Sequence, residues 1–157
     1  MLLTLVSGVF WGTWFSLSRS MHTLPADYFI TIGKTIMGNV AVAMGIMMPA
    51  IIICMVFFLL NTRRSQPVYF YSMLTSLILF ASALFITLTV EVPIDNQIKT
   101  RTPQSVPADW ENIRDRWQVF HTARTFLTLG SVLFFMCAVL NKKDPPPASP
   151  PPPAGDK

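Results

Sequence analysis

This chain has little charge and few of the residues that bind metals or form disulfides. Charged residues make up 13% of its 157 positions, whereas 52% are hydrophobic, and no polar stretch is long enough to form a separate soluble domain. It has two cysteines without a CxxC pair and two histidines without the spacing of a metal site. It also lacks a glycine-rich phosphate loop and a recognisable quinone or haem motif. No metal and no organic cofactor is therefore implied by any spacing.

What the chain does have is four apolar stretches. They lie at roughly 2–17, 40–60, 68–90 and 122–140. A helix needs about 20 mostly apolar residues to cross a hydrocarbon core, which the first and fourth stretches reach when their flanking turns are included. Backbone groups in lipid must bond within the protein, and these runs do not alternate as barrel strands do. The sequence therefore predicts an all-α, polytopic membrane protein, a four-transmembrane-helix bundle.

We expect a single domain over residues 1–143. The four spans are predicted at about 2–19, 39–60, 68–91 and 120–140. A short interfacial helix within 21–37 is expected to run into the second span, and Pro93 is expected to end the third. Residues 144–157 contain two proline runs and are predicted to be a disordered tail. Docking of this tail into an aromatic groove on a partner is the alternative.

Basic residues lie mostly at helix ends, so the net charge of +4 does not indicate nucleic-acid binding. One basic pair, Arg63 and Arg64, follows the second span, and another, Lys142 and Lys143, follows the fourth. The positive-inside rule then places the C-terminus in the cytoplasm and the connection over 91–121 outside. We expect the inner (plasma) membrane of a bacterium.

The first stretch lacks the basic region that begins a signal peptide, so we favour a retained span over a cleaved signal. Gly8, Gly12 and Ser16 have the spacing that lets membrane helices approach closely, and we expect this row to pack. In the second span, Pro49 predicts a kink and a freed carbonyl near Gly45, which marks either a cavity or simple bending.

The two cysteines, Cys54 and Cys137, fall inside predicted spans at similar depth. Their depth allows contact between them. We interpret them instead as small apolar packing residues, which is the commoner use of a cysteine in a core.

The last helix carries the most informative pattern. It is the row formed by Trp110, Ile113, Trp117, His121 and Arg124. Steps of three and four residues place this row on one helix face. Ionisable residues at membrane depth are costly, so they usually face the bundle interior and pair. The row therefore predicts a polar site inside the bundle.

Other segments are expected to bring polar side chains to the same end of the bundle. These are Arg19, Lys34, Asn39, Glu91, Asp95 and Asn96. The simple alternatives are residues that reach lipid headgroups, or a structural ion pair between Glu91 and Arg124. Because so many polar groups share one small mouth, we favour a functional site.

Several short motifs lie around these residues. They are VEVPIDNQI at 90–98, PADW at 107–110, RDRW at 114–117 and HTART at 121–125, with GVFWG at 8–12 and LSRS at 17–20. Together they resemble the anthrone-oxygenase-like family of small four-helix membrane proteins. The resemblance covers nearly the whole chain up to Leu140 and excludes the proline-rich tail.

The resemblance implies a cofactor-independent oxygenation of an anthrone to an anthraquinone. The substrate loses a proton from an acidic C–H bond, and the carbanion reacts with O2 directly. His121 is implied as the general base, because imidazole exchanges protons near neutral pH. Arg124 is implied as the stabiliser of the enolate or phenolate oxygen, with Asn96 as a second donor. Glu91 or Asp95 would orient these groups.

The remaining predicted site residues are assigned to substrate binding. Trp117 and Trp110 offer flat surfaces for stacking aromatic rings, and Arg19 and Asn39 complete the expected polar mouth. A non-catalytic accessory subunit, or a binder of a lipid or quinone-like ligand, is the alternative function. A homo-oligomer or a membrane-protein partner fits either function. A transporter is less favoured, because four spans show no internal repeat.

Overall fold

The computed structural model describes residues 1–18, 20–61, 67–102, 106 and 108–142, and within them the chain is helical without a strand. The helices are α1 (Leu2–Thr13), α2 (Ala26–Leu60), α3 (Pro67–Ile86), α4 (Val92–Thr100) and α5 (Trp110–Leu140). A π-helical turn, Trp14–Ser18, extends α1, and a second, Thr87–Glu91, joins α3 to α4. The all-α prediction is confirmed. The predicted tail and Arg19 lie outside the described residues.

Three helical segments are long and apolar enough to cross a membrane. They are Gly38–Leu60, Pro67–Thr100 and Trp110–Leu140. The N-terminal segment Leu2–Ser18 is apolar but shorter. The chain is therefore an integral membrane protein with a helical bundle, and the count of four spans stays a prediction.

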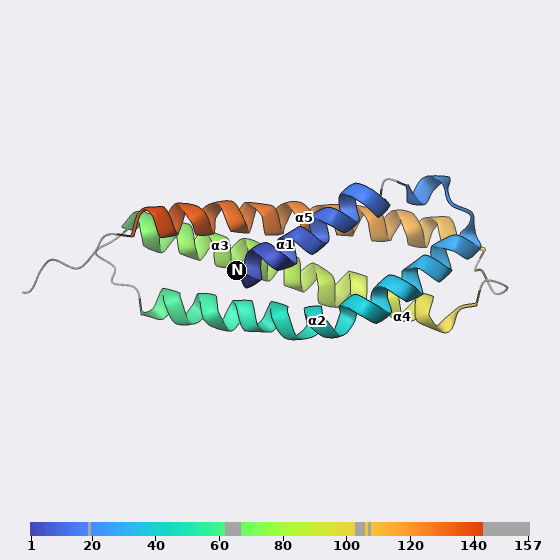
Figure 1. The fold of residues 1–157 in the computed structure, drawn as a ribbon, viewed down its shortest axis with the longest axis horizontal. Coiled ribbons are helices and arrows are strands. Elements are labelled where there is room, and N and C mark those ends of the chain that lie inside the picture. Colours follow the sequence, from blue (N-terminus) through green and yellow to red (C-terminus); the bar gives the residue numbers. More distant parts are fainter. Residues whose placement is uncertain (19, 62–66, 103–105, 107, 143–157) are drawn as a thin grey trace, which may run out of the picture.

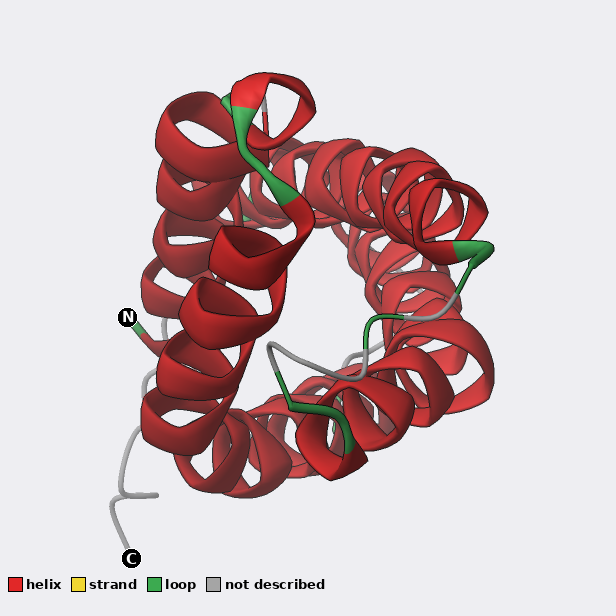
Figure 2. Cartoon of the chain, turned by 90° about the vertical axis from the view of Figure 1, so that its right-hand side faces the viewer, coloured by secondary structure: helices red, strands yellow, loops and turns green. Residues whose placement is uncertain are grey.

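The long helices α2, α3 and α5 run along the long axis of the molecule, and α1 crosses them obliquely (Figure 1). Seen down that axis, the helices surround a common centre (Figure 2). The most extensive helix–helix contact joins α3 to α5. There Ser76 and Ser131 exchange hydrogen bonds, since each Oγ donates to the other residue's carbonyl, at 2.7 and 2.9 Å. Small polar residues of this kind let membrane helices pack closely.

Two apolar clusters fill the bundle. The first joins α1, α2, α3 and α5 and includes Phe10, Met48 and Phe80. The second lies toward α4 and consists of Met21, Phe29, Ile30, Ile94, Ile98 and Trp117. Phe10 and Trp117 both contact His121, so a polar residue lies where the two clusters meet.

Two local features differ from the sequence-based expectation. The helix does not end at Pro93: α4 continues to Thr100, with this proline in its first turn, where a missing N–H is tolerated. The expected packing row of α1 is also wrong. Gly8 and Gly12 are exposed, and a Cβ atom added to either would meet nothing within 4 Å. The tight approach is instead at Gly130 in α5, where an added Cβ would lie 3.3 Å from Leu79 Cδ1.

The expectations for the second span and for the segment before it agree better with the structure. The interfacial segment and the span form one continuous helix, α2, with Pro49 inside it. Gly45 and Pro49 both border a cavity, which agrees with the cavity interpretation of the proline. The cysteines are different: Cys54 and Cys137 are free and exposed, so neither packs in the core.

Candidate functional site

Arg124 is the centre of a buried polar cluster. Its Nη2 lies 2.9 Å from Oε2 of Glu91, an ion pair whose geometry falls short of a hydrogen bond. Its Nη1 donates to Thr87 Oγ1 at 3.3 Å. The guanidinium also lies over the Phe10 ring, 4.4 Å from its centroid, a favourable cation–π distance. Helices α1 and α5 and the π-helical turn before α4 thus converge on one positive charge.

His121 is held on three sides and is 1% exposed. Trp117 stacks on it with the ring centroids 4.7 Å apart and the planes 6° from parallel, and Phe10 meets it edge-on at 6.3 Å. Its Nδ1 accepts hydrogen bonds from Arg124, at 3.2 Å from Nε and 2.9 Å from Nη2. Within the described residues, its Nε2 has no partner in hydrogen-bond geometry, and the backbone of Phe10 lies near the ring.

Two carboxylates lie one helical turn apart beside this pair. Glu91 ends the π-helical turn and is buried, with Oε1 lacking a hydrogen-bond partner. Asp95, in the first turn of α4, has a buried Oδ1 that also lacks a partner. Buried polar atoms normally find partners, so unpartnered oxygens and an unpartnered imidazole nitrogen in one place are unusual. Such a group of atoms is typical of a site that receives a ligand.

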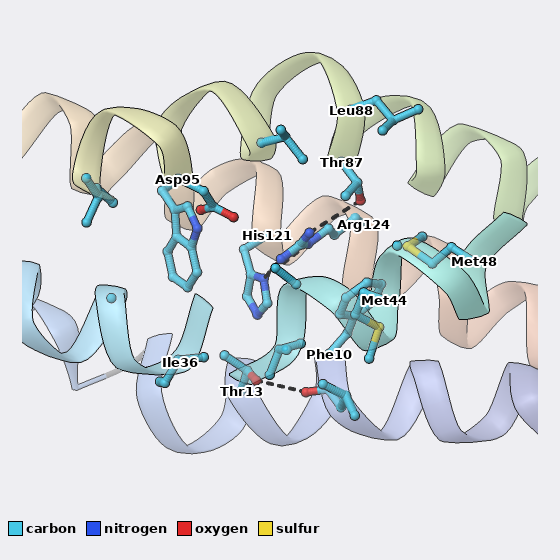
Figure 3. Close-up of a pocket in the computed structure, with 18 of the residues that line it drawn as sticks. Phe10, Thr13, Ile36, Met44, Met48, Thr87, Leu88, Asp95, His121 and Arg124 are labelled. Atoms are coloured by element: carbon cyan, nitrogen blue, oxygen red, sulfur yellow. Dashed lines mark hydrogen bonds between the residues drawn. The ribbon is translucent and has the colours of Figure 1, made fainter. Parts of the chain in front are cut away.

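A cavity of about 240 Å³ reaches this cluster. Asp95, His121, Arg124 and Thr87 supply most of its polar lining (Figure 3). Its remaining lining is mostly apolar and comes largely from α2, including Ile36, Val40, Met44 and Met48. Phe10 of α1, Leu84 of α3 and Leu88 of the π-helical turn after α3 also line it. Small-molecule sites are typically apolar hollows with a few placed polar groups. The cavity suits a mainly apolar molecule that carries a polar group.

The structure brings only some of the predicted site residues together. The cavity is lined by His121, Arg124 and Trp117. Glu91 contacts Arg124 but does not line the cavity. Trp110 lies at the start of α5 and borders a smaller hollow. Its ring stacks against Arg114, whose Cζ lies 4.9 Å from the ring centroid.

Asn39 and Asn96 are exposed and do not line the cavity. Each is one position away from a cavity residue, Val40 and Asp95, and one position turns a side chain by about 100° around a helix. Sequence spacing alone did not identify Phe10 and Thr87. The spacing of Thr87, Glu91 and Asp95, four residues apart, is a signal that would have placed Thr87 near the cluster.

The N-terminal segment is tied to α5 at the same end of the bundle. Trp14 Nε1 donates to Thr122 Oγ1 at 3.0 Å, and the Gln118 amide donates to the Ser18 carbonyl. These contacts fix the position of Phe10 and Thr13, which border the cavity from α1. Among the residues that the structure describes, no three histidine, cysteine or acidic side chains gather as a metal site.

Fold and site together define a helical membrane protein with a mainly apolar cavity lined by a histidine–arginine–carboxylate cluster. A family model described as anthrone oxygenase matches residues 28–134, which include α3, α4 and most of α2 and α5. The chain belongs to this family. Searches of curated proteins and of solved structures gave no significant match.

Proposed function

We propose that this chain is a cofactor-independent oxygenase of an apolar, anthrone-like aromatic substrate. The observation that supports it most is the mainly apolar cavity, which is lined by Asp95, His121 and Arg124, with unpartnered atoms on the first two. Membership of the anthrone oxygenase family supports the same chemistry. A substrate that partitions into the bilayer would reach such a cavity from the membrane itself.

The proposed reaction needs a proton acceptor and a stabiliser of negative charge at one place. Removal of a proton from the methylene of an anthrone leaves an anion whose charge spreads onto the carbonyl oxygen. Addition of O2 to the carbanion gives a peroxide, and loss of water from it leaves a second carbonyl. One oxygen atom enters the product and the other leaves as water. Preorganised donors at the oxygen lower the barrier to such a step.

The sequence-based prediction gives the role of base to His121 and that of oxyanion stabiliser to Arg124. Both residues line the cavity, as does Trp117, whose ring stacks on His121. The division of roles inside the cluster depends on which imidazole nitrogen carries the proton.

The test is oxygen uptake by the purified protein in nanodiscs supplied with a simple anthrone. We expect uptake above the spontaneous rate, reduced about 100-fold or more in His121→Ala, because a base or an oxyanion donor contributes at least that factor. Asn39→Ala, at an exposed position on α2, is the matched control and should keep wild-type uptake. Uptake that equals the spontaneous rate would contradict oxygenase activity and favour the non-catalytic binder.

We also propose that the C-terminus lies in the cytoplasm of a bacterial cell, on the strength of the basic pairs after the second and fourth predicted spans. Reporter fusions after Leu140 and within the 101–109 connection test this orientation. Cytoplasmic reporter activity at the first position and periplasmic activity at the second are expected, and the reverse pattern would contradict it.

A further inference from the structure

We propose that Asp95 is the base that removes the substrate proton and that His121 donates a hydrogen bond from Nε2 to the substrate oxygen. This inference rests on the proposed oxygenase function and exchanges the roles that the sequence suggests. It follows from the hydrogen bonds of the imidazole, the lining of the cavity and the use of the Arg124 donors.

The contact with Arg124 determines which nitrogen of His121 carries the proton. A guanidinium has only N–H donors and stays protonated in proteins. Two of its nitrogens lie 2.9 and 3.2 Å from Nδ1, so Nδ1 must present its lone pair. A neutral imidazole has one donor and one acceptor, and its proton is therefore on Nε2. The opposite tautomer would direct an N–H at the guanidinium and lose both bonds.

The imidazole of His121 belongs to the cavity lining, and its Nε2–H has no partner in hydrogen-bond geometry among the described residues. In Figure 3 the imidazole projects from α5 toward the part of the cavity bordered by Ile36 and Thr13. With Nε2 protonated, the ring cannot accept a proton from a substrate at that atom. It can donate to an oxygen on which charge develops, and loss of such a donor typically lowers the rate about 100- to 1,000-fold in other active sites.

Asp95 is then the acceptor for the proton. It is the sole carboxylate among the described residues that line the cavity, and its Oδ1 is buried without a partner. Glu91 does not line the cavity and lies against Arg124. A carboxylate base combined with neutral donors at the oxygen is a known solution for proton removal beside a carbonyl.

Arg124 is a positioning residue in this scheme. Its Nε and Nη2 are directed at His121, its Nη2 also at Glu91, and its Nη1 at Thr87. Few of its N–H groups remain for a substrate. It acts by holding the tautomer and orientation of His121, as second-layer partners do for other functional histidines.

The proton and electrons balance in three steps. The substrate C–H bond breaks, its proton passes to the Asp95 carboxylate, and the electron pair spreads to the carbonyl oxygen that His121 Nε2–H contacts. The carbanion then bonds to O2, which is the oxidant, and the resulting peroxide takes up the proton held by Asp95. Water leaves from the peroxide as the second C–H bond breaks, and the carbon becomes a carbonyl.

Deuterium exchange tests the base separately from the oxygen step. Wild-type protein in nanodiscs, without O2 and in D2O, should exchange the methylene hydrogens of the anthrone faster than buffer does. Asp95→Asn should lower this exchange about 100-fold or more, the contribution typical of a general base. His121→Gln, whose amide can still donate, should lose about tenfold or less. Glu111→Gln, at an exposed carboxylate on α5, is the control and should exchange like wild type.

Two exchange results would overturn the inference. Wild-type exchange in Asp95→Asn would remove Asp95 as the base. A loss in His121→Gln as large as that in Asp95→Asn would remove the donor role of His121.

The tautomer has its own readout, which does not need activity. In the ¹⁵N NMR spectrum of histidine-labelled protein, the His121 signals are those that vanish in His121→Gln, leaving His22. We expect a protonated Nε2 and an unprotonated, hydrogen-bonded Nδ1; a protonated Nδ1 would overturn the donor role. Exchange without oxygen uptake would keep Asp95 as base and reject the oxygenase. If the wild-type protein accelerates neither the exchange nor the oxygen uptake, the proposed function and the base role both fail. The NMR spectrum still determines the tautomer.

Discussion

Helix α5 contains two buried polar regions with opposite hydrogen-bond balance. Toward α3, Ser76 and Ser131 satisfy each other, and toward α1, Ser7 Oγ donates to the Thr128 carbonyl at 3.3 Å. Toward α4, the cluster of Glu91, Asp95, His121 and Arg124 leaves atoms without partners beside a cavity. We call the first the serine contact and the second the arginine cluster.

The difference separates packing from function. Both regions are buried, so burial of polar residues alone does not identify a site. In the serine contact the hydrogen bonds join neighbouring helices, as those of structural polar groups in membrane proteins do. The arginine cluster keeps donors and acceptors free in a place where an unpartnered polar atom is expensive. Such a cost is expected where a ligand completes the bonding.

The largest effect should come from breaking the ion pair in the arginine cluster. Glu91→Ala removes the counter-charge of Arg124 and leaves a buried cation, which typically costs about 3–5 kcal/mol of unfolding free energy. Unfolding of the variant in mixed micelles, followed by circular dichroism, measures the loss. Arg124→Ala with Glu91→Ala should recover part of it. An unchanged stability in Glu91→Ala would contradict the ion pair.

A smaller loss is expected at the serine contact. Ser131→Ala removes one interhelical donor, and such bonds in membrane proteins are worth about 0.6 kcal/mol on average, up to about 1.7. Stability should fall by an amount in this range, whereas oxygen uptake should stay at the wild-type level. A strong loss of uptake from this substitution would break the separation between the two regions.

At Asp95 a substitution should not lower the stability of the protein. Asp95→Asn replaces a carboxylate that has an unpartnered buried oxygen, so we expect stability to stay level or rise by about 0.5 kcal/mol while activity is lost. The same micelle unfolding measurement and the uptake assay give the two numbers. A loss of several kcal/mol would show that Asp95 is structural.

The smallest effect is expected at Asn96, beside Asp95 but exposed. Asn96→Ala should change stability by less than about 0.5 kcal/mol, as most surface substitutions do. Steady-state kinetics should give wild-type kcat and KM. A change in kcat of tenfold or more would show that Asn96 takes part in the reaction, as the sequence suggested.

The sequence predicted the helical class and the inward face of α5 because both depend on periodic patterns. Trp117, His121 and Arg124 share that face, and Glu91 was expected at their depth. Asn39 and Asn96 were misplaced relative to the cavity because matching depth does not fix the angle around a helix. The π-helical turn Thr87–Glu91 changes that angle, and no residue pattern announced it.

The N-terminal helix shows the same limit. Gly8 and Gly12 have the right spacing for packing, yet they face outward, since α1 buries Leu3, Val6, Ser7 and Phe10 instead. From the sequence, α1 could pack against the bundle either through its two glycines or through its apolar row. Which of these faces is buried depends on the partner helices.

The central claim is that the arginine cluster beside the apolar cavity is an oxygenation site. The most direct measurement is the initial rate at which ¹⁸O from ¹⁸O2 enters the quinone when wild-type protein and His121→Ala are given a simple anthrone under identical conditions. The account predicts one ¹⁸O atom per quinone, formed faster than in buffer by wild type and near the buffer rate by the variant. Equal rates in all three samples would contradict it.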